Sequence, residues 1–139
     1  MTTPPPKYED PEGYSESPFG EFMGLHTLEI TDEHVLAELE TRPQHLNPTG
    51  AIHGGVFIAL ADNIGTAMAN RAHMALTDEV TFMVGIDLHA NMMANQPGGT
   101  IHFEARPIRV GRRVVFVRTT VTGDNGRKLA EVTTTHVPA

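Results

Sequence analysis

The chain of 139 residues contains no cysteine. This absence excludes a disulfide framework, a thiolate nucleophile and any metal site built on sulfur ligands. Serine is almost as scarce, because Ser15 and Ser17 are the only two and both lie in a segment rich in proline and glutamate. Such a composition is typical of unstructured tails, so we do not expect a serine nucleophile on a packed scaffold. Hydrolytic chemistry here would have to use a carboxylate or a histidine.

Long apolar runs are also missing, since none approaches the roughly 20 residues that a membrane-spanning helix needs. The first residues, Met-Thr-Thr-Pro-Pro-Pro, lack the charged and then apolar layout of a signal peptide. These features favour a cytoplasmic protein without a membrane partner. Bases are scarce in residues 1–40, which hold ten acids against Lys7 alone, and the net charge of −7 argues against a nucleic-acid partner.

Metal ligands in a recognisable pattern are absent as well. The eight histidines form no pair at zinc-ligand spacing with a carboxylate nearby, so we expect no metal site and interpret them as scattered surface residues. A basic cluster is present near the C-terminus, at Arg109, Arg112 and Arg113. It would suit the phosphates of a bound ligand, but a solvated charge cluster at a strand end explains it equally well.

The pattern of apolar residues predicts one domain over residues 18–139 behind a flexible tail, residues 1–17. A long helix is expected from Gly54 to about Ala72, because this stretch is apolar on most sides. Alternating segments predict an antiparallel sheet whose last four strands form a meander. The expected elements are a short helix at 18–23, a hairpin of 25–30 and 34–41, a loop at 42–52, and strands at 80–91, 99–108, 112–122 and 128–137. The order indicates an α+β fold in which one long helix lies against the sheet.

The most informative motif joins Asn47 to His53-Gly54-Gly55, and then to Asp62 beyond an apolar run. Two glycines let the backbone approach a ligand closely, and a helix N-terminus offers unpaired N–H groups at the positive end of its dipole. We expect Asp62 to be buried among apolar neighbours, which costs stability unless the carboxylate is paired or used.

Each of these residues also has a plain structural interpretation. Asn47 could be a turn residue before Pro48, and His53 a capping or hydrogen-bonded loop histidine. Gly54-Gly55 could be a tight transition into the helix, and Asp62 a structurally paired acid. The combination at these spacings favours a functional site.

The motif resembles that of the hotdog-fold acyl-CoA thioesterases of the phenylacetate-pathway type. Two later segments, Val84–Asn91 and Pro107–Arg112, are similar to strands of that family, so the resemblance covers roughly residues 18–137. It implies a hotdog fold: a curved antiparallel sheet wrapped around the helix. It further implies a dimer with a continuous sheet, commonly assembled as a dimer of dimers, and no cofactor besides the coenzyme A of the substrate.

The resemblance also implies roles for single residues. The Gly54 N–H would polarise the thioester carbonyl, Asp62 would act as general base or nucleophile, and Asn47 and His53 would position water or substrate. From the residues themselves we also expect Gly55, Gly85 and the arginine cluster to contact substrate. Two departures stand out: Gly85 replaces a Ser or Thr of some members, and His89 replaces a frequent Asn. Gly85 leaves open how the attacking water is held.

The spacing within the helix has a further consequence. The eight residues from Gly54 to Asp62 span roughly 12 Å of helix, whereas reacting groups must meet within about 3–3.5 Å. We therefore hypothesise that two antiparallel helices bring Asp62 of one chain to Gly54 of another. The helix face needed for such close approach would comprise Gly55, Ala59, Asp62, Thr66 and Ala69.

Two other functions compete with hydrolysis. A non-catalytic acyl-CoA-binding protein would bind without turnover, and usually carries a DNA-binding segment that the acidic tail does not resemble. A hotdog dehydratase or hydratase would need a histidine and an acid in a different arrangement. The sequence leaves open the acyl group, the choice between coenzyme A and acyl carrier protein, dimer against tetramer, and the role of the acidic tail.

Overall fold

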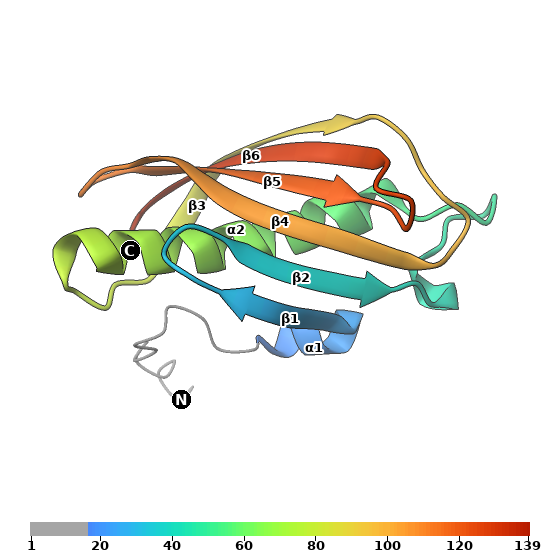
Figure 1. The fold of residues 1–139 in the computed structure, drawn as a ribbon, viewed down its shortest axis with the longest axis horizontal. Coiled ribbons are helices and arrows are strands. Elements are labelled where there is room, and N and C mark those ends of the chain that lie inside the picture. The colour runs from blue at the N-terminus through green and yellow to red at the C-terminus, as the bar shows by residue number, and fades with distance from the viewer. Residues whose placement is uncertain (1–16) are drawn as a thin grey trace, which may run out of the picture.

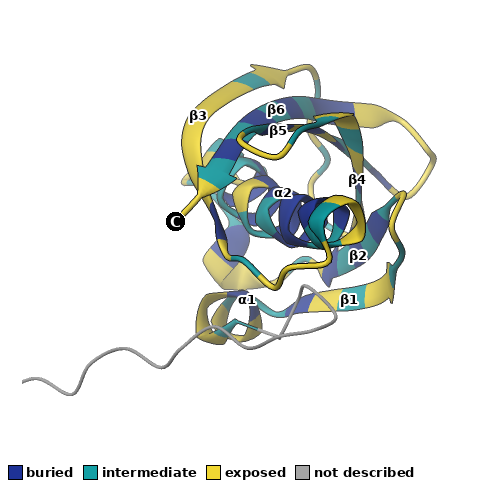
Figure 2. Ribbon diagram, turned by 90° about the vertical axis from the view of Figure 1, so that its left-hand side faces the viewer, coloured by how far each residue is buried: buried dark blue, intermediate teal, exposed yellow. Residues whose placement is uncertain are grey.

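A single long helix, α2 (Gly54–Thr77), runs through the centre of the computed structural model, which describes residues 17–139. The sheet curves around it, and Figure 2 shows the helix end-on with its buried residues facing the strands. The helix continues five residues past the predicted end at Ala72. Its C-cap residue is Asp78, which adopts the left-handed conformation (φ 59°) and donates its N–H to the Met74 carbonyl.

Six antiparallel strands form the sheet, in the order β1-β2-β4-β5-β6-β3 (Figure 1). This arrangement is the predicted hotdog fold, with a long helix held by a curved sheet. One detail of the prediction is wrong: the last four strands are not a meander, because β3 pairs with β6 and not with β4. The strand bounds are β1 Leu25–Ile30, β2 Val35–Glu40, β3 Met83–Met92, β4 Thr100–Val110, β5 Val115–Thr122 and β6 Lys128–Pro138.

Strand β3 is an edge of the sheet, and it is the most exposed strand. The segment before Met83 was predicted as strand but is not, because pairing with β6 begins only at Met83 opposite Pro138. A register shift between Gly85 and Asp87 interrupts the pairing. Apolar side chains remain exposed along the strand, up to 61% for Ile86. An exposed, apolar and unpaired edge is a ready site for pairing with another chain.

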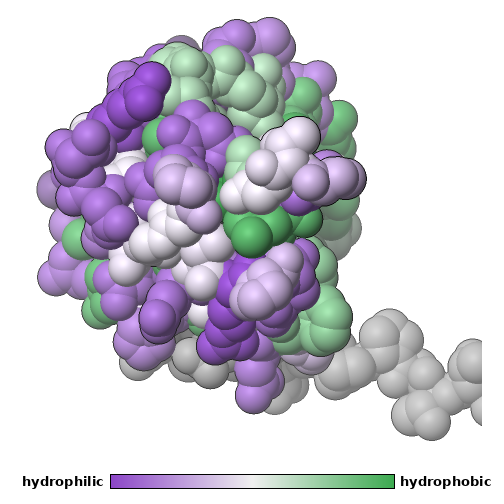
Figure 3. Space-filling view, turned by 90° about the vertical axis from the view of Figure 1, so that its right-hand side faces the viewer, coloured by the Kyte–Doolittle hydropathy of each residue, from purple (hydrophilic) through white to green (hydrophobic). Residues whose placement is uncertain are grey.

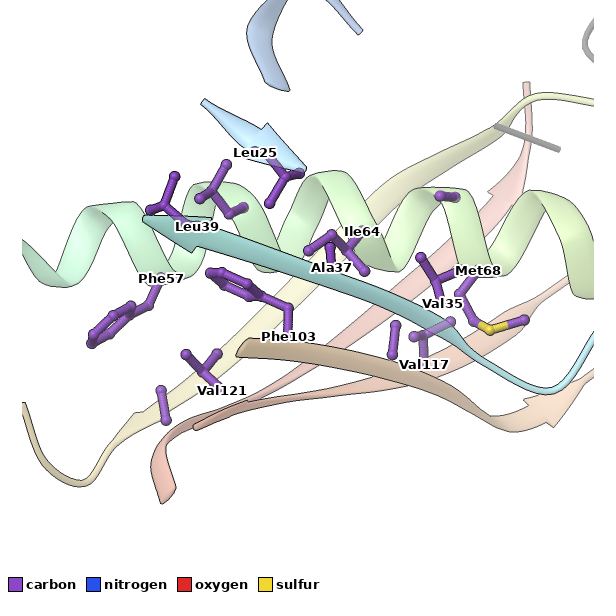
Figure 4. Close-up of a cluster of buried hydrophobic side chains, with 14 of the residues drawn as sticks. Leu25, Val35, Ala37, Leu39, Phe57, Ile64, Met68, Phe103, Val117 and Val121 are labelled. Carbon is purple, nitrogen blue, oxygen red and sulfur yellow. The ribbon is translucent and has the colours of Figure 1, made fainter. Parts of the chain in front are cut away.

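The core lies between α2 and the concave face of the sheet. Figure 4 shows Phe57, Ile64 and Met68 of the helix beside Phe103 and Val117 of the sheet. These side chains are almost fully buried. Burial of each large apolar side chain contributes about 1.5–3 kcal/mol, so the core fixes the orientation of α2 and of the polar residues along it.

The short helix α1 (Pro18–Met23) precedes the sheet. Ser17 caps it by accepting a hydrogen bond from the Gly20 N–H, and its hydroxyl donates to Asn63 Oδ1 on α2. Ser17 was predicted to belong to the flexible tail, yet its hydroxyl has a structural role in capping α1 and joining it to α2. The rest of the predicted tail, residues 1–16, lies outside the described residues. Within the described part of the chain, no helix is long and apolar enough to cross a bilayer.

Candidate active site

The N-terminus of α2 is organised by His53, which is its N-cap residue. The His53 Nδ1 accepts a hydrogen bond from the Gly55 N–H at 3.0 Å, and the His53 carbonyl accepts one from the Val56 N–H at 2.9 Å. The predicted pair of free donors at Gly54 and Gly55 is therefore reduced to one. Nothing in residues 17–139 accepts a hydrogen bond from the Gly54 N–H. This group points out of the positive end of a 24-residue helix and can serve an anionic oxygen.

Gly54 also has a close neighbour on the edge strand. A Cβ at Gly54 would stand 3.1 Å from the terminal methyl carbon of Met92, at the end of β3. The lack of a side chain at Gly54 therefore keeps the helix N-terminus accessible beside this methionine. Figure 3 views the molecule from the end at which α2 begins, where hydrophilic surface surrounds a smaller hydrophobic patch.

Asn47 supports the loop that leads to the helix. Its Oδ1 accepts hydrogen bonds from the Thr49 N–H, the Thr49 hydroxyl and the Ala51 N–H at 2.7–3.2 Å. The amide oxygen is thus occupied within its own loop, while Nδ2 has no partner among the described residues. The geometry gives Asn47 the turn role that was one of its two interpretations, and leaves its NH₂ group as the part able to reach a ligand.

Asn95 was missed by the sequence analysis, although it holds the same loop. Its Oδ1 accepts from the Ile52 N–H at 3.1 Å, and its Nδ2 donates to the Ile52 carbonyl at 2.8 Å. This pair of bonds fastens the segment after β3 to the residue that precedes the His53 cap. A lone Asn after a strand carries no sequence signal that distinguishes it from any other loop residue.

Asp62 lies on α2 beside the edge strand, and it is exposed rather than buried in the single chain. The expectation of burial was wrong because the helix face that carries Asp62 lies at the edge of the sheet and stays open to solvent. Partial desolvation nevertheless raises the pKa of the Asp62 carboxyl above its ordinary value. A Cβ at Gly85 would stand 3.4 Å from Asp62 Oδ1. The structure therefore brings the predicted residues Asp62 and Gly85 together.

The two halves of the predicted site remain separate within one chain. Gly54 and Asp62 are held apart by the continuous helix, at roughly 1.5 Å per residue. Strand β3 contacts both, at Met92 and at Gly85. Of the helix face expected to allow close approach, Gly55 and Asp62 are exposed, whereas Ala69 is fully buried in the core.

The arginine cluster lies at the other end of the molecule from Gly54. Arg109 is the second-last residue of β4, and Arg112 and Arg113 are exposed in the turn before β5. The Arg112 carbonyl accepts a hydrogen bond from His73, which is 19 residues beyond Gly54 on α2. A single chain therefore does not bring these arginines to its own Gly54.

Three histidines correct the expectation that all eight are surface residues. His45, His73 and His136 are buried, with exposures of 0%, 3% and 0%. Of these, His136 lies near Asp62, because a Cβ at Gly85 would also stand 3.8 Å from His136 Nδ1. The described residues contain no cluster of three or more side chains able to hold a metal ion.

A surface pocket of about 460 Å³ opens at the end of the molecule where α2 begins. Residues 95–99 and the turn between β5 and β6 line it, and none of the predicted site residues does. Among its lining residues, Asn95 is the one that connects it to the site, because the Asn95 side chain accepts a hydrogen bond from the Ile52 N–H.

Comparison with known proteins identifies the family of the chain. Residues 49–130 match the model of the thioesterase superfamily, and this match includes both Gly54 and Asp62. The candidate esterase Rv1847 of Mycobacterium tuberculosis is 31% identical over 81% of this chain and 80% of its own. Its structure superposes with a TM-score of 0.82 at 28% identity, covering 88% of this chain and 97% of that one.

Two further proteins are similar to this chain in sequence or in fold. A 1,4-dihydroxy-2-naphthoyl-CoA hydrolase of Listeria monocytogenes is 27% identical over 66% of this chain and 72% of its own. The structure of the PaaI protein of E. coli has a TM-score of 0.79 at 14% identity, covering 88% of this chain and 85% of that one, and shares the fold. The chain belongs to the thioesterase superfamily and is a hotdog-fold thioester hydrolase.

Proposed function

We propose that this protein hydrolyses the thioester of an acyl- or aryl-acyl-coenzyme A to the free acid and coenzyme A. The observation that carries the proposal is the pairing of an unoccupied Gly54 N–H at a helix N-terminus with Asp62 beside the edge strand. The name of the Listeria relative supports an acyl-CoA substrate. A solved relative from Streptococcus mutans that is bound to acetyl CoA shares the fold.

In this mechanism the thioester carbonyl oxygen accepts a hydrogen bond from the Gly54 N–H. As the carbonyl carbon is attacked, this oxygen gains negative charge that the N–H and the helix dipole stabilise. Removal of one such donor typically lowers kcat about 100- to 1,000-fold. The C–S bond then breaks and coenzyme A leaves as a thiol.

Asp62 delivers the attacking group as either a general base or a nucleophile. As a base it takes a proton from water and passes it to the departing sulfur. As a nucleophile it forms an acyl anhydride that water then hydrolyses. Mass spectrometry of the rapidly quenched enzyme separates the two routes, because only the nucleophilic route adds the mass of the acyl group to the peptide containing Asp62.

The proposed site is shared between two chains. The exposed apolar edge of β3 supports dimerisation through this strand, because the side of β3 that faces away from β6 has no strand neighbour in the described chain. The same strand carries Gly85, which lies beside Asp62, and Met92, which lies beside Gly54, so pairing along it would bring a second chain close to both halves. Asp62 of one chain would then serve the thioester held at Gly54 of the other.

Heterodimers test this arrangement. Gly54→Pro removes the N–H but suits the first helical position, and Asp62→Ala removes the carboxylate. A dimer of one Gly54→Pro chain and one Asp62→Ala chain should recover about half of wild-type activity, because one of its two symmetry-related sites is intact. Each homodimer should be inactive. Verified heterodimers without activity would show that the site lies within one chain.

The arginine cluster is proposed to hold the phosphates of coenzyme A. Arg112 and Arg113 are exposed and carry no ion pair among the described residues. Replacing both with Ala should raise KM for an acyl-CoA and leave KM for the matching acyl-pantetheine thioester unchanged, since that substrate lacks the nucleotide phosphates. Equal effects on both substrates would exclude this role.

Assays on short, medium, long and aromatic acyl-CoAs, with Asp62→Ala as the control, test the proposed function as a whole. Hydrolysis of at least one group, abolished by the substitution, is expected. Binding of these ligands without turnover of any would instead favour the acyl-CoA-binding alternative.

A further inference from the structure

A cluster of three polar side chains is buried under the middle of α2. Thr119 on β5 and Thr134 and His136 on β6 are 0%, 2% and 0% exposed. The helix backbone lies directly on them at Gly65, where a Cβ would stand 2.8 Å from Thr134 Oγ1 and 3.7 Å from His136 Nε2. Gly65 is one helical turn beyond Asp62, so the cluster lies close to the proposed catalytic carboxylate.

Hydrogen bonding within this cluster is incomplete. His136 Nε2 and Thr134 Oγ1 are 2.8 Å apart and form one hydrogen bond. His136 Nδ1 is buried and has no partner among the described residues. Burying a polar atom without a hydrogen-bond partner lowers the stability of the fold by about 1–3 kcal/mol. A native structure that retains such an atom therefore needs an explanation for it. Burial lowers the pKa of His136 to about 4, and its ring is therefore neutral at pH 7.

The unpaired nitrogen faces the same space as Asp62. Gly85 on β3 pairs with His136 across the two strands. The point where a Gly85 Cβ would stand is 3.8 Å from His136 Nδ1 and 3.4 Å from Asp62 Oδ1. Because residue 85 is a glycine, no side chain of β3 lies between these two polar atoms.

We propose that His136 is a positioning residue for Asp62 and acts through one bound water that bridges Nδ1 and Oδ1 above Gly85. The Thr134 hydroxyl donates to Nε2 and so places the ring proton on Nδ1. The Nδ1–H donates to the water, and the water donates to the carboxylate. This chain of bonds orients Asp62 and favours its ionised form, against the desolvation that raises its pKa. The inference rests on the proposed function only for the catalytic role of Asp62.

The other charged groups near this stretch of α2 are either exposed or paired with each other. Strand β3 carries Asp87 and His89, both exposed, and Arg118 on β5 pairs with Glu131 on β6 at 3.0 Å. Desolvation is the cause of the Asp62 shift. Among the titratable groups of the strands packed here, His136 is thus the one aimed at the Gly85 space.

The direct test compares the acid limb of the kcat/KM pH profile in His136→Phe, Thr134→Val and Thr134→Ser. Loss of the bridge should raise the Asp62 pKa, so His136→Phe should move the acid limb about one pH unit upward. At a pH on that limb kcat/KM should fall about tenfold, which corresponds to one pKa unit. In Thr134→Val no hydroxyl donates to Nε2, so the ring proton stays on Nε2 and Nδ1 cannot donate to the water. This variant should therefore also move the acid limb upward. Thr134→Ser retains the hydroxyl and should restore the wild-type limb.

His73→Phe is the matched control. His73 is also buried, bonds the Arg112 carbonyl through Nε2 at 2.9 Å and has an unpaired Nδ1. It lies 11 residues beyond Asp62, or roughly 16 Å along the helix. Its loss should lower stability without moving the acid limb. An equal shift in His73→Phe would overturn the proposal, because a general loss of stability would then explain both.

A third variant does not depend on a buried histidine. Gly85→Ala places a methyl group at the bridging point on the exposed edge strand, and should raise the Asp62 pKa by displacing the water. The Asp62 carboxyl can be titrated directly by ¹³C NMR, with Asp62→Asn assigning the signal. An unchanged Asp62 pKa in folded His136→Phe and Gly85→Ala overturns the inference. An inactive wild-type enzyme would refute the proposed function instead, and the NMR titration would still decide this point.

Discussion

Asp62 and Gly54 lie on one continuous helix, eight residues apart, and the edge strand β3 contacts both of them. The helix separates the two residues by roughly 12 Å along its axis. In the proposed mechanism each chain would present both groups but could not direct them at the same carbonyl. Under the proposed mechanism, a second chain across β3 would account for both the exposed carboxylate and the exposed apolar strand.

Asp62→Asn should nearly abolish turnover while stabilising the fold at neutral pH. A positioned acid or base contributes about 10²- to 10⁴-fold to rate. Because the folded-state pKa of Asp62 is raised, the native state binds more protons than the unfolded chain above pH 3.8. Ionisation of Asp62 therefore lowers stability as the pH rises through this range, and the cost persists at pH 7. The Tm of Asp62→Asn should exceed that of wild type at pH 7 but not at pH 3.

Asp78→Asn is a suitable comparison, since it also removes one carboxylate, and Asn tolerates the left-handed conformation found there. We expect unchanged turnover in this variant. A Tm gain of equal size would show that the stabilisation reflects net charge and not the local environment of Asp62.

His53 is expected to have two separable roles. His53→Ala loses the cap on the Gly55 N–H and should destabilise the protein by about 1 kcal/mol. His53→Asn supplies a side-chain oxygen that caps well, and should restore the Tm. If the ring also positions substrate, kcat/KM of His53→Asn should stay at least tenfold low, measured beside the urea unfolding midpoint. Full activity in His53→Asn would show that His53 caps the helix and does not position substrate.

Several features could be predicted from residue patterns because they depend on local chemistry. Gly54-Gly55 after a capping histidine predicted the start of α2, and the apolar character of the following residues predicted its burial. Adjacent strands were predicted at 112–122 and 128–137, and β5 pairs with β6 across the turn at Gly123–Gly126. These features need only nearest neighbours in the chain, so the sequence is sufficient to show them.

Features that depend on distant parts of the chain were not predictable in this way. Strand β3 carries apolar residues at alternate positions, as a core strand would, and adjacency along the chain favoured pairing with β4. Only the closed sheet shows that β3 crosses to β6 and leaves Ile86 exposed. The burial of His136 likewise depends on Gly65 and Gly85, which lie 71 and 51 residues earlier in the chain.

Asn95 should control the oxyanion donor from a distance. Asn95→Asp keeps the acceptor for the Ile52 N–H but replaces the donor with a carboxylate oxygen facing the Ile52 carbonyl at a separation near 2.8 Å. The repulsion should displace the loop that carries His53 and Gly54. Because a poorly placed donor weakens transition-state binding, kcat should fall about 10- to 100-fold with a smaller change in KM.

Asn125→Asp provides the control for this substitution. Asn125 Oδ1 accepts only from the Arg127 N–H in its own turn, at 3.0 Å, and Asp can accept the same bond. We expect wild-type kcat. If Asn95→Asp raised KM and left kcat unchanged, Asn95 would contribute to substrate binding and not to the placement of Gly54.

The burial of His136 predicts a specific dependence of stability on pH. Its folded-state pKa of about 4 lies below the unfolded value of 6.5, so the unfolded chain binds more protons between these values. Stability should therefore be complete above pH 6.5 and fall as the pH decreases toward 4, by about 2–3 kcal/mol from this group. His136→Phe cannot titrate here, so its unfolding free energy should change less over the same range. Urea unfolding of both proteins at pH 7.5, 5.5 and 4.5 measures the difference. Parallel losses in the two proteins would mean that carboxylates, not His136, set the acid sensitivity of the fold.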